Sequence, residues 1–477
     1  MLLRKIRLAY IFELVLLAGG SLFLLYCFAF YRGVTCDERE HTYASFMFFR
    51  GFLPYRDFFE HHHPLLWFLS YPIVWFFHNS GYIWYVLRAV MLLVLAVDCV
   101  FISKICRLFS SDKLFPWVAV LLFLCSECVL HSGSEFRPDN LMLMFGVAGI
   151  YYWLCFIKYG WQAALNLSFL MFFLSFLALQ KAIVLILPVA GVSLFFVSQG
   201  KVSWQAVGKA FILPVFFTIC FVWFWYCEGA LKVYFEQNFL FNLMQRFDFS
   251  VDIYNTPYCW CGVVGAVGIL FFCRDVLFKV LAVLCLATYF LLQIVFYTPW
   301  LQYWLPIYPY FAIICAFWTL KWQNIIVRFV ILSAWLGWLS FFWVNKAPVI
   351  RSFMPMKHVV LLSSQILEIV DEDEFIIGNN DTLGGLRFEA MGYYWFERGY
   401  AALLNYRLFH RREWPDKEKV IKVRKPKIIA KSNQRVCLRE DDFVFSYGSC
   451  YETENLFYQD FLDEHYYDQG FVYVRKN

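Results

Sequence analysis

Residues 9–31 read AYIFELVLLAGGSLFLLYCFAFY and are followed at once by RGVTCDEREH at 32–41. The first stretch has the length of about 20 mainly apolar residues that a helix needs to cross a bilayer. The second stretch is dense in acids and bases, which are costly to bury in hydrocarbon. We therefore expect a membrane span that ends directly in a charged loop.

The same kind of apolar run recurs along the first 345 residues. We expect eleven spans in all, at about 9–31, 82–103, 114–131, 140–157, 162–179, 183–198, 208–228, 257–273, 278–298, 303–320 and 325–344. A further apolar run at 64–78 is short and contains Pro64 and Pro72, so we interpret it as an interfacial or re-entrant helix. If it crossed the membrane, the orientation of everything after it would be reversed.

Composition excludes a water-soluble globule. Hydrophobic residues make up 61% of the 477 positions, against roughly 45–50% in an ordinary soluble domain. Only 16% are charged, and these are unevenly placed, with 39 in the last 132 residues and 38 in the first 345. We expect a transmembrane domain at 1–345 and a second domain at 346–477. The net charge of +5, without a dense basic tract, gives no sign of nucleic-acid binding.

Basic residues indicate the orientation, because Lys and Arg favour short cytoplasmic loops. With the amino terminus inside, every inner loop is basic: Arg4, Lys5 and Arg7; Lys104, Arg107 and Lys113; Lys158; Lys201 and Lys209; Arg274 and Lys279; Lys321 and Arg328. The acid-rich loops and the tail then lie outside. We expect a multi-pass protein, of a cell inner membrane, whose active site and C-terminal domain are extracytoplasmic.

The tail alternates helix-like and strand-like stretches. Met356–Val370 has a helical pattern, EFIIG at 374–378 and KIIA at 427–430 have strand patterns, and aromatic-rich segments close the chain. We expect a small α/β domain. Most of the 16 Cys stand alone in apolar runs, where Cys is a small buried hydrophobe, whereas Cys437 and Cys450 of the polar tail could pair in an oxidising compartment.

The first outer loop, residues 32–64, is the strongest candidate for chemistry. It combines Asp37 and Glu38, just past the first span, with a later run that includes Asp57 and Glu60 and ends in three His. Such a loop could simply face water or lipid headgroups. However, a carboxylate at the interface, where a lipid-linked phosphate would lie, can also take a proton from an acceptor.

Two other outer boundaries carry cations. Arg137 precedes Pro138, which suits the first turn of a helix, and Asp139 follows in that turn, where the helix dipole favours an acid. Gln180-Lys181 stands at a later outer boundary. Each base alone is more typical of a side chain that reaches for the headgroups. Their convergence on one face favours a phosphate site.

These residues together resemble a known family. The Asp37-Glu38 pair, the stretch Gly51–Leu65, Arg-Pro-Asp at 137–139, Lys181 before a run ending in Pro188, and the Gln302–Pro309 stretch are similar to the GT-C membrane glycosyltransferases. The most similar branches are the protein O-mannosyltransferases and the lipid A aminoarabinose transferases. The resemblance covers about 10–345. The His61-His62-His63 triplet departs from the shorter His/Lys-Pro pattern of relatives, which leaves the role of that corner open.

The resemblance implies an inverting transfer of a sugar from a polyprenyl-phosphate donor to a lipid, glycan or protein acceptor outside the membrane. It implies Asp37 as the base with Glu38 orienting or sharing that role, Arg137 and Lys181 on the donor phosphate, and substrate contacts from His41, Tyr55, Arg56, Asp57, Asp139, Gln302 and Tyr303. No cofactor is required, but a divalent metal on Glu60 with His61 or His62 fits the ligand types. The same His run is equally suited to a hydrogen-bonding surface.

Two other functions stay open. Glu13, Asp98 and Glu127 lie within or near spans, and intramembrane charge often marks a transport path for lipid or sugar. Against a transporter, charge concentrates in loops on one side, and no inverted repeat is visible. A surface-polysaccharide ligase or polymerase would share the lipid-phosphate donor, but usually lacks an Asp-Glu loop directly after the first span.

Overall fold

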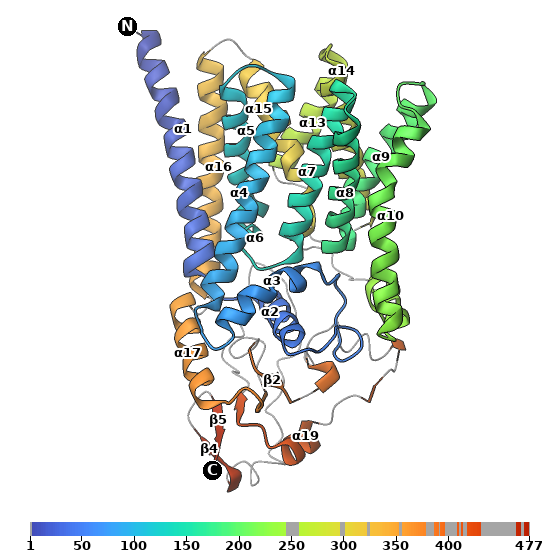
Figure 1. Cartoon of the computed structure of the whole chain (residues 1–477). Coiled ribbons are helices and arrows are strands. Elements are labelled where there is room, and N and C mark those ends of the chain that lie inside the picture. The colour runs from blue at the N-terminus through green and yellow to red at the C-terminus, as the bar shows by residue number, and fades with distance from the viewer. Residues whose placement is uncertain are drawn as a thin grey trace. The chain divides into compact units, whose positions relative to one another are not determined.

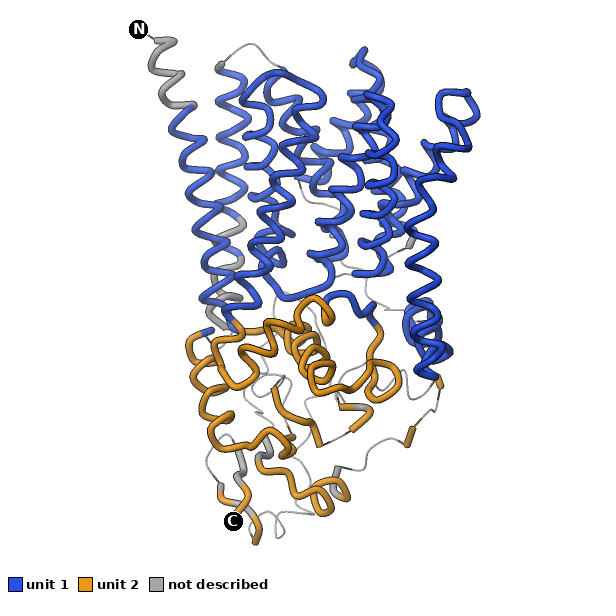
Figure 2. Tube along the Cα trace, viewed as in Figure 1, with its two compact units in different colours: residues 1–33, 62–66, 85–356 blue, residues 34–61, 67–84, 357–477 orange. Residues whose placement is uncertain are grey.

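The structure is a computed structural model that describes residues 2–244, 257–295, 301–321, 325–352, 355–377, 386–390, 392–395, 408–409, 412–413, 417–430, 464–468 and 472–476. The chain forms two compact units, which Figure 2 distinguishes by colour. The first unit, called the helical unit below, comprises residues 1–33, 62–66 and 85–356. The second, called the mixed unit, comprises residues 34–61, 67–84 and 357–477.

Long helices that run side by side build the helical unit (Figure 1). Its elements are α1 (Leu2–Tyr26), the π-helical η1 (Cys27–Tyr31), α4 (Ile83–Phe109, which begins in the mixed unit), α5 (Leu114–Leu124), α6 (Glu127–Ser132), α7 (Pro138–Tyr159), α8 (Gln162–Ala178), η2 (Gln180–Ala182), α9 (Ile183–Ser198), α10 (Trp204–Cys227), α11 (Leu231–Phe235), the π-helical η3 (Glu236–Leu240), α12 (Phe241–Met244), α13 (Pro257–Phe272), α14 (Val276–Val295), η5 (Leu301–Ile307), α15 (Tyr308–Lys321) and α16 (Ile325–Ser352).

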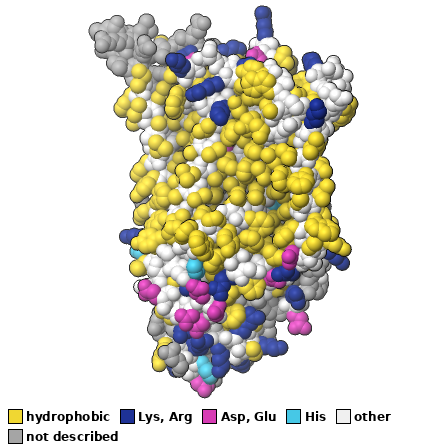
Figure 3. Space-filling model, viewed as in Figure 1, with side chains coloured by type: hydrophobic (Ala, Val, Ile, Leu, Met, Phe, Trp, Pro, Cys, Tyr) yellow, Lys and Arg dark blue, Asp and Glu magenta, His cyan; other side chains and the backbone are white. Residues whose placement is uncertain are grey.

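The described parts of the eleven expected spans are mostly helical, and the span at 114–131 is interrupted at Cys125-Ser126, between α5 and α6. Within the described part of the chain, seven stretches are long and apolar enough to cross a bilayer: 11–31, 83–109, 138–159, 180–198, 204–227, 276–294 and 301–321. The remaining four expected spans contain shorter apolar helices, at 114–124, 162–178, 258–272 and 326–341. A broad band of hydrophobic side chains covers the helices on the face shown in Figure 3. The chain is therefore an integral multi-pass membrane protein, as its sequence predicted.

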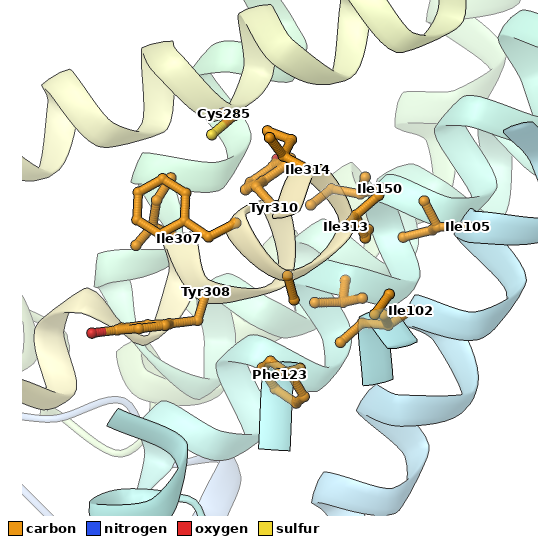
Figure 4. Packing of buried hydrophobic residues seen from close by; sticks show 14 of the residues in the cluster. Ile102, Ile105, Phe123, Ile150, Cys285, Ile307, Tyr308, Tyr310, Ile313 and Ile314 are labelled. Atoms are coloured by element: carbon orange, nitrogen blue, oxygen red, sulfur yellow. The ribbon is translucent and has the colours of Figure 1, made fainter. Parts of the chain in front are cut away.

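The core of the helical unit is apolar and joins elements far apart in sequence. Ile102 of α4, Phe123 of α5 and Ile150 of α7 are at most 3% exposed and belong to one buried cluster. Figure 4 shows them around the start of α15, where Tyr308 and Ile314 enter the same cluster. This packing fixes the position of η5 and therefore of the predicted site residues Gln302 and Tyr303.

The mixed unit contains α2 (Cys36–Phe49), most of α3 (Leu65–Phe77), α17 (Met356–Ile369), α19 (Lys417–Arg424) and a small sheet. Its strands are β1 (Phe375–Ile377), β2 (Phe388–Glu389), β3 (Ile428–Ala430), β4 (Tyr466–Asp468) and β5 (Val472–Arg475), in the order β2-β1-β3-β5-β4. Strand β1 pairs in parallel with β2 and β3, whereas β5 pairs antiparallel with β3 and β4.

The α/β character predicted for the tail is confirmed. The helical pattern at 356–370 corresponds to α17, and the two strand patterns at 374–378 and 427–430 correspond to β1 and β3. The run at 64–78 forms α3, a short helix with Pro72 inside. Cys437 and Cys450 lie outside the described residues.

Within the mixed unit, the tail packs on the first outer loop. Tyr43 of α2 lies 4.2 Å from Trp395 between ring centroids, and its hydroxyl accepts a hydrogen bond from the backbone N–H of Glu389 at 3.2 Å. The backbone of Phe59 donates to the carbonyl of Tyr393 and accepts from the indole N–H of Trp395. Residues 34–61 and the described tail therefore share one core, although they stand more than 300 positions apart in sequence.

A polar joint adds to this packing. Glu372 accepts hydrogen bonds from Asn79 and from Arg50, the latter at 2.7 Å. The Asn79 hydrogen bond, more than the contact with His78, lowers the pKa of Glu372 against the effect of its partial burial. The buried Arg387 donates to the Val370 carbonyl at the end of α17 and to the Asn79 side chain. These contacts hold the loop before α4 to the sheet.

In the helical unit, helices α13 and α15 approach so closely that glycine is required between them. A Cβ on Gly262 would lie 2.0 Å from the ring of Phe311, which is fully buried. On Gly208 of α10, in contrast, a Cβ would meet nothing within 4 Å. Small residues at such crossings let membrane helices pack backbone to backbone.

We therefore expect Gly262→Ala to destabilise the helical unit by about 1–3 kcal/mol, since the ring of Phe311 must move. Gly208→Ala is the matched control and should be neutral or slightly stabilising, because alanine is the better helix former. Thermal unfolding of both variants in the same detergent measures the difference. Equal melting temperatures would contradict the close approach of α13 and α15.

Candidate active site

Asp37 lies in the first turn of α2, and the sequence around it explains why the helix starts there. Thr35 is the N-cap residue: its hydroxyl accepts a hydrogen bond from the N–H of Glu38 at 3.4 Å, and its N–H donates to the Glu38 carboxylate at 3.0 Å. This reciprocal pair is a capping box. Glu38 is 1% exposed, whereas Asp37 is partly exposed. The carboxylate of Glu38 is thus used to start the helix that presents Asp37.

The other substrate-contact candidates of this loop have defined places in the mixed unit. His41 is 1% exposed and accepts a hydrogen bond from the indole N–H of Trp67 at 3.4 Å. Asp57 accepts from the N–H of Leu53 at 2.8 Å and pairs with Arg56 at 2.9 Å, which closes a turn. Tyr55, 1% exposed, has a φ of 68°, a costly conformation for a large side chain. The contacts of Asp57 shape the turn segment that ends at Glu60.

Glu60 and His61 converge with a residue from α2. Potential ligand atoms of Glu40, Glu60 and His61 lie within 4.8 Å of one another. The imidazole Nδ1 of His61 is 3.7 Å from a carboxylate oxygen of Glu40 and 3.7 Å from one of Glu60. Two carboxylates and an imidazole are a set that divalent metals accept. Sequence reasoning predicted Glu60 and His61 but missed Glu40, whose only signal was its position one turn after Asp37.

The two other His of the triplet belong to the helical unit. His62, which directly follows His61, is half-buried. His63 is fully buried among the rings of Phe176, Tyr234 and Phe239, and its Nδ1 is 3.1 Å from the Tyr234 hydroxyl. Burial in this aromatic cage lowers the pKa of His63 to about 3. His63 is therefore a neutral core residue near neutral pH, which explains why the triplet is longer than a metal site needs.

The helical unit brings the predicted phosphate ligands together. Pro138 is the first residue of α7, and Arg137 is its extended N-cap. The Arg137 guanidinium lies 3.2 Å from Glu135 and 3.5 Å from Asp139, and the ammonium of Lys181 lies 3.9 Å from Asp139. Lys181 also stands 3.1 Å from the ring centroid of Tyr303. Segments about 120 residues apart in sequence thus meet in one charged cluster.

Gln302 completes the set of predicted substrate contacts. It is 7% exposed in η5, next to Tyr303 in the chain. Four of the predicted residues in the helical unit form a chain of contacts, in which Arg137 lies next to Asp139, Asp139 next to Lys181, and Lys181 over the ring of Tyr303. The predicted residues of the first outer loop that belong to the mixed unit fall into two groups, one in α2 and one in the turn segment up to His61.

Sequence reasoning missed two buried arginines. Arg32 is 1% exposed, forms an ion pair with Glu135 and donates to the His131 carbonyl at 3.3 Å. Arg88 of α4 is also 1% exposed and donates to four backbone carbonyls, those of Phe28, Ala29, Arg32 and Gly33. It therefore caps the carbonyl end of η1. The signal for Arg88 was a lone charge inside an apolar run, and for Arg32 a charge directly at a span end.

The acids within spans have structural neighbours. Glu13 accepts a hydrogen bond from Ser333, and Glu127 accepts one from the Tyr308 hydroxyl at 2.9 Å. Asp98 is 1% exposed in α4. Glu13 thus joins α1 to α16, and Glu127 joins α6 to α15, so two of the three acids connect helices.

Comparisons with known proteins bear on the fold. No protein family and no curated protein matches the chain in sequence. Among solved structures, it is similar to ArnT from Cupriavidus metallidurans bound to undecaprenyl phosphate, with a TM-score of 0.53, 12% identity, and coverage of 74% of this chain and 70% of that one. Apo ArnT from the same organism has a TM-score of 0.51 and 10% identity, with coverage of 74% of this chain and 69% of that one. The arabinosyltransferase EmbB from Mycobacterium smegmatis has a TM-score of 0.45 and 11% identity, with coverage of 87% of this chain and 39% of that one. The GT-C fold expected from the motifs is confirmed.

The capping box yields a test of what Glu38 does. We expect Glu38→Ala to lower the free energy of unfolding by roughly 0.5–2 kcal/mol, because the start of α2 loses its reciprocal hydrogen bond. Glu38→Gln should remain close to the wild type, since an amide oxygen can accept from the N–H of Thr35. Thermal unfolding of the two variants measures this. If Gln destabilised as much as Ala, charge and not capping would be the contribution of Glu38.

Proposed function

We propose that the protein is an inverting glycosyltransferase that moves a sugar from a polyprenyl-phosphate donor to a lipid, glycan or protein acceptor at the outer face of the membrane. The observation that carries this proposal is the fold shared over 74% of the chain with ArnT, a protein solved with undecaprenyl phosphate bound. Support comes from the cluster of Arg137, Lys181 and Asp139 in the helical unit, and from Asp37 at the start of α2.

On the donor side, the leaving group is a phosphate. It is already a stable anion near neutral pH, so its departure needs fixed cations and no general acid. Arg137 presents a planar fork that matches two phosphate oxygens, and Lys181 presents a point charge. Both side chains are at most 15% exposed, so water screens their charges only weakly.

On the acceptor side, Asp37 acts as the general base. A base must be accessible and must accept a proton as the acceptor oxygen or nitrogen attacks the anomeric carbon. Of the Asp37-Glu38 pair, only Asp37 has a partly exposed carboxylate that the capping box does not use. Attack from the side opposite to the phosphate inverts the configuration of the sugar carbon.

Glu40, Glu60 and His61 are proposed to hold a divalent metal. The convergence of two carboxylates and one imidazole within 4.8 Å fits the donor set that such an ion requires. When bound, the ion would supply positive charge near the substrate. The contact of His61 with Glu40 also joins α2, which bears Asp37, to the segment after Asp57. It therefore orders the loop whether or not a metal is bound.

The proposed orientation follows the basic loops. The amino terminus lies inside, in a cell inner membrane, and the active site and C-terminal residues lie outside. The packing of the described tail on residues 34–61 supports this arrangement, because a segment that shares a core with the first outer loop must lie on the same side of the membrane.

Replacing the base tests the chemistry. We expect Asp37→Asn to reduce sugar transfer by at least about 100-fold, since loss of a positioned base typically removes 10²–10⁴ in rate. The substitution keeps the volume and a hydrogen-bonding group, so the protein should still insert and unfold at the wild-type temperature. The measurement is release of polyprenyl phosphate from a labelled polyprenyl-phosphate sugar, which also separates transfer from transport.

Asp112→Asn is the matched control for this change. Asp112 lies in an exposed loop, accepts a hydrogen bond from the N–H of Leu114, and is expected to tolerate the amide with full activity. Near-normal turnover by Asp37→Asn would transfer the role of the base to another acid of the outer loops.

Replacing the cations tests donor binding. We expect Arg137→Ala and Lys181→Ala each to weaken binding of undecaprenyl phosphate by roughly 10- to 150-fold, equivalent to the 1.5–3 kcal/mol of a charge-assisted contact. Arg137→Lys should also be impaired, because an ammonium does not reproduce the planar fork. Titration of undecaprenyl phosphate into the purified variants gives the dissociation constants.

Lys321→Ala is the control for lost charge. Lys321 stands 4.5 Å from the ring centroid of Trp318, so it too is a cation over an aromatic ring. It ends α15, and the rise of 1.5 Å per residue places it roughly 20 Å from Tyr308. Its loss should leave donor affinity unchanged. Wild-type affinity in both Arg137→Ala and Lys181→Ala would remove these two residues from the donor site.

A further inference from the structure

Arg32 stands at the end of the first span in a position that the surrounding backbone holds firmly. The guanidinium of Arg88 donates to the carbonyl of Arg32 at 2.6 Å and to that of Gly33 at 2.8 Å, and to two carbonyls of η1. These carbonyls form the negative end of a helix, which suits a buried cation. Because these hydrogen bonds fix the backbone of Arg32 and Gly33, they also fix the direction in which the Arg32 side chain extends to Glu135.

Glu135 is shared between two guanidinium groups. One carboxylate oxygen, Oε1, pairs with Arg32, and the other, Oε2, lies 3.2 Å from Arg137. The Arg32 and Glu135 side chains are each 1% exposed, so both charges interact at low dielectric. Arg137 is 10% exposed and so is the more accessible of the two arginines. Arg32 therefore neutralises much of the acid that Arg137 contacts.

The charges of this cluster show what Arg32 contributes. Arg137 and Lys181 face two acids, Glu135 and Asp139, so these four ionised side chains carry no net charge. Arg32 makes the total +1. A third buried acid, Glu127, lies in α6, and if it is ionised too, the six side chains balance with Arg32 and carry −1 without it. Without Arg32, the remaining side chains of the cluster carry no net positive charge that would attract an anionic ligand.

We infer that Arg32 is a positioning residue for the donor phosphate, which it serves by holding Glu135 so that Arg137 can turn to the ligand. Arg32 itself does not touch the phosphate. This inference rests on the proposed function, because it assumes that Arg137 and Lys181 bind a polyprenyl phosphate. It adds that the affinity of the site depends on competition between Glu135 and the phosphate for Arg137.

Four proteins test this inference by titration with undecaprenyl phosphate: the wild type, Arg32→Gln, Glu135→Gln and the double variant. We expect Arg32→Gln to weaken binding by about 10-fold or more, because Glu135 then acts on Arg137 alone. Glu135→Gln should bind as tightly as the wild type or more tightly. The double variant restores the charge balance and should return to within about threefold of the wild type, since adjacent sites couple.

A purely structural role for the ion pair predicts a different pattern. Removing either partner of a buried pair leaves the other charge uncompensated, so Glu135→Gln would then weaken binding as Arg32→Gln does. If Arg32→Gln does not fold, the donor affinity of the single variant Glu135→Gln still distinguishes the positioning role from the purely structural one. Weaker binding by folded Glu135→Gln, or wild-type affinity in Arg32→Gln, would overturn the inference.

The kinetic readout separates this role from a general loss of activity. Arg32→Gln should raise the KM for the donor and leave the KM for the acceptor unchanged. Failure of the wild type itself to bind undecaprenyl phosphate would contradict the proposed function and not the role of Arg32 alone. Wild-type binding with an unaffected Arg32→Gln variant would contradict only the inference about Arg32.

Discussion

The cost of placing charge in hydrocarbon is the constraint on which this structure depends. An ionised group at the centre of a bilayer is expensive, so the chain keeps most of its charges at helix ends or holds them in buried pairs. Arg32, Arg137 and Lys181 all stand next to the ends of spans and contact acids or backbone carbonyls. A low-dielectric surrounding strengthens the interactions of these three cations with the acids and carbonyls that they contact.

The same constraint explains why so much of the fold could be predicted from the sequence. Spans must be long and apolar, so the helical runs could be predicted, and α17, β1 and β3 have ordinary periodic patterns. Span length was harder to read. The run at 114–131 is interrupted at Cys125-Ser126, where α5 ends and Glu127 begins α6. Hydropathy averaged over a window does not register such a break, because α5 before it is apolar and Cys128–Leu130 after it are apolar too.

For the candidate site, the sequence predicts residues that contact one another in the structure, but not the hydrogen bonds that each of them makes. The motifs identified Arg137, Asp139 and Lys181, which do meet, but sequence spacing could not distinguish Asp37 from Glu38. That distinction arises from the reciprocal hydrogen bonds with Thr35, which bury one carboxylate of the pair. Arg32 was missed because an arginine at a span end usually contacts headgroups, and Arg88 was missed because it is a single charge within the apolar run of α4. Their contacts depend on helices distant in sequence, which no local pattern encodes.

The mixed unit shows why the chain needs a tail. The first outer loop contains α2 and a turn segment, and together they are too short to bury a core of their own. Phe59 is held on both sides by Tyr393 and Trp395, directly before Glu60, and the φ of 68° at Tyr55 requires surroundings that compensate for its cost. The Tyr393 hydroxyl supplies part of this, because it donates to the Tyr55 carbonyl at 3.0 Å. The described tail thus supplies the core that holds the strained loop in place.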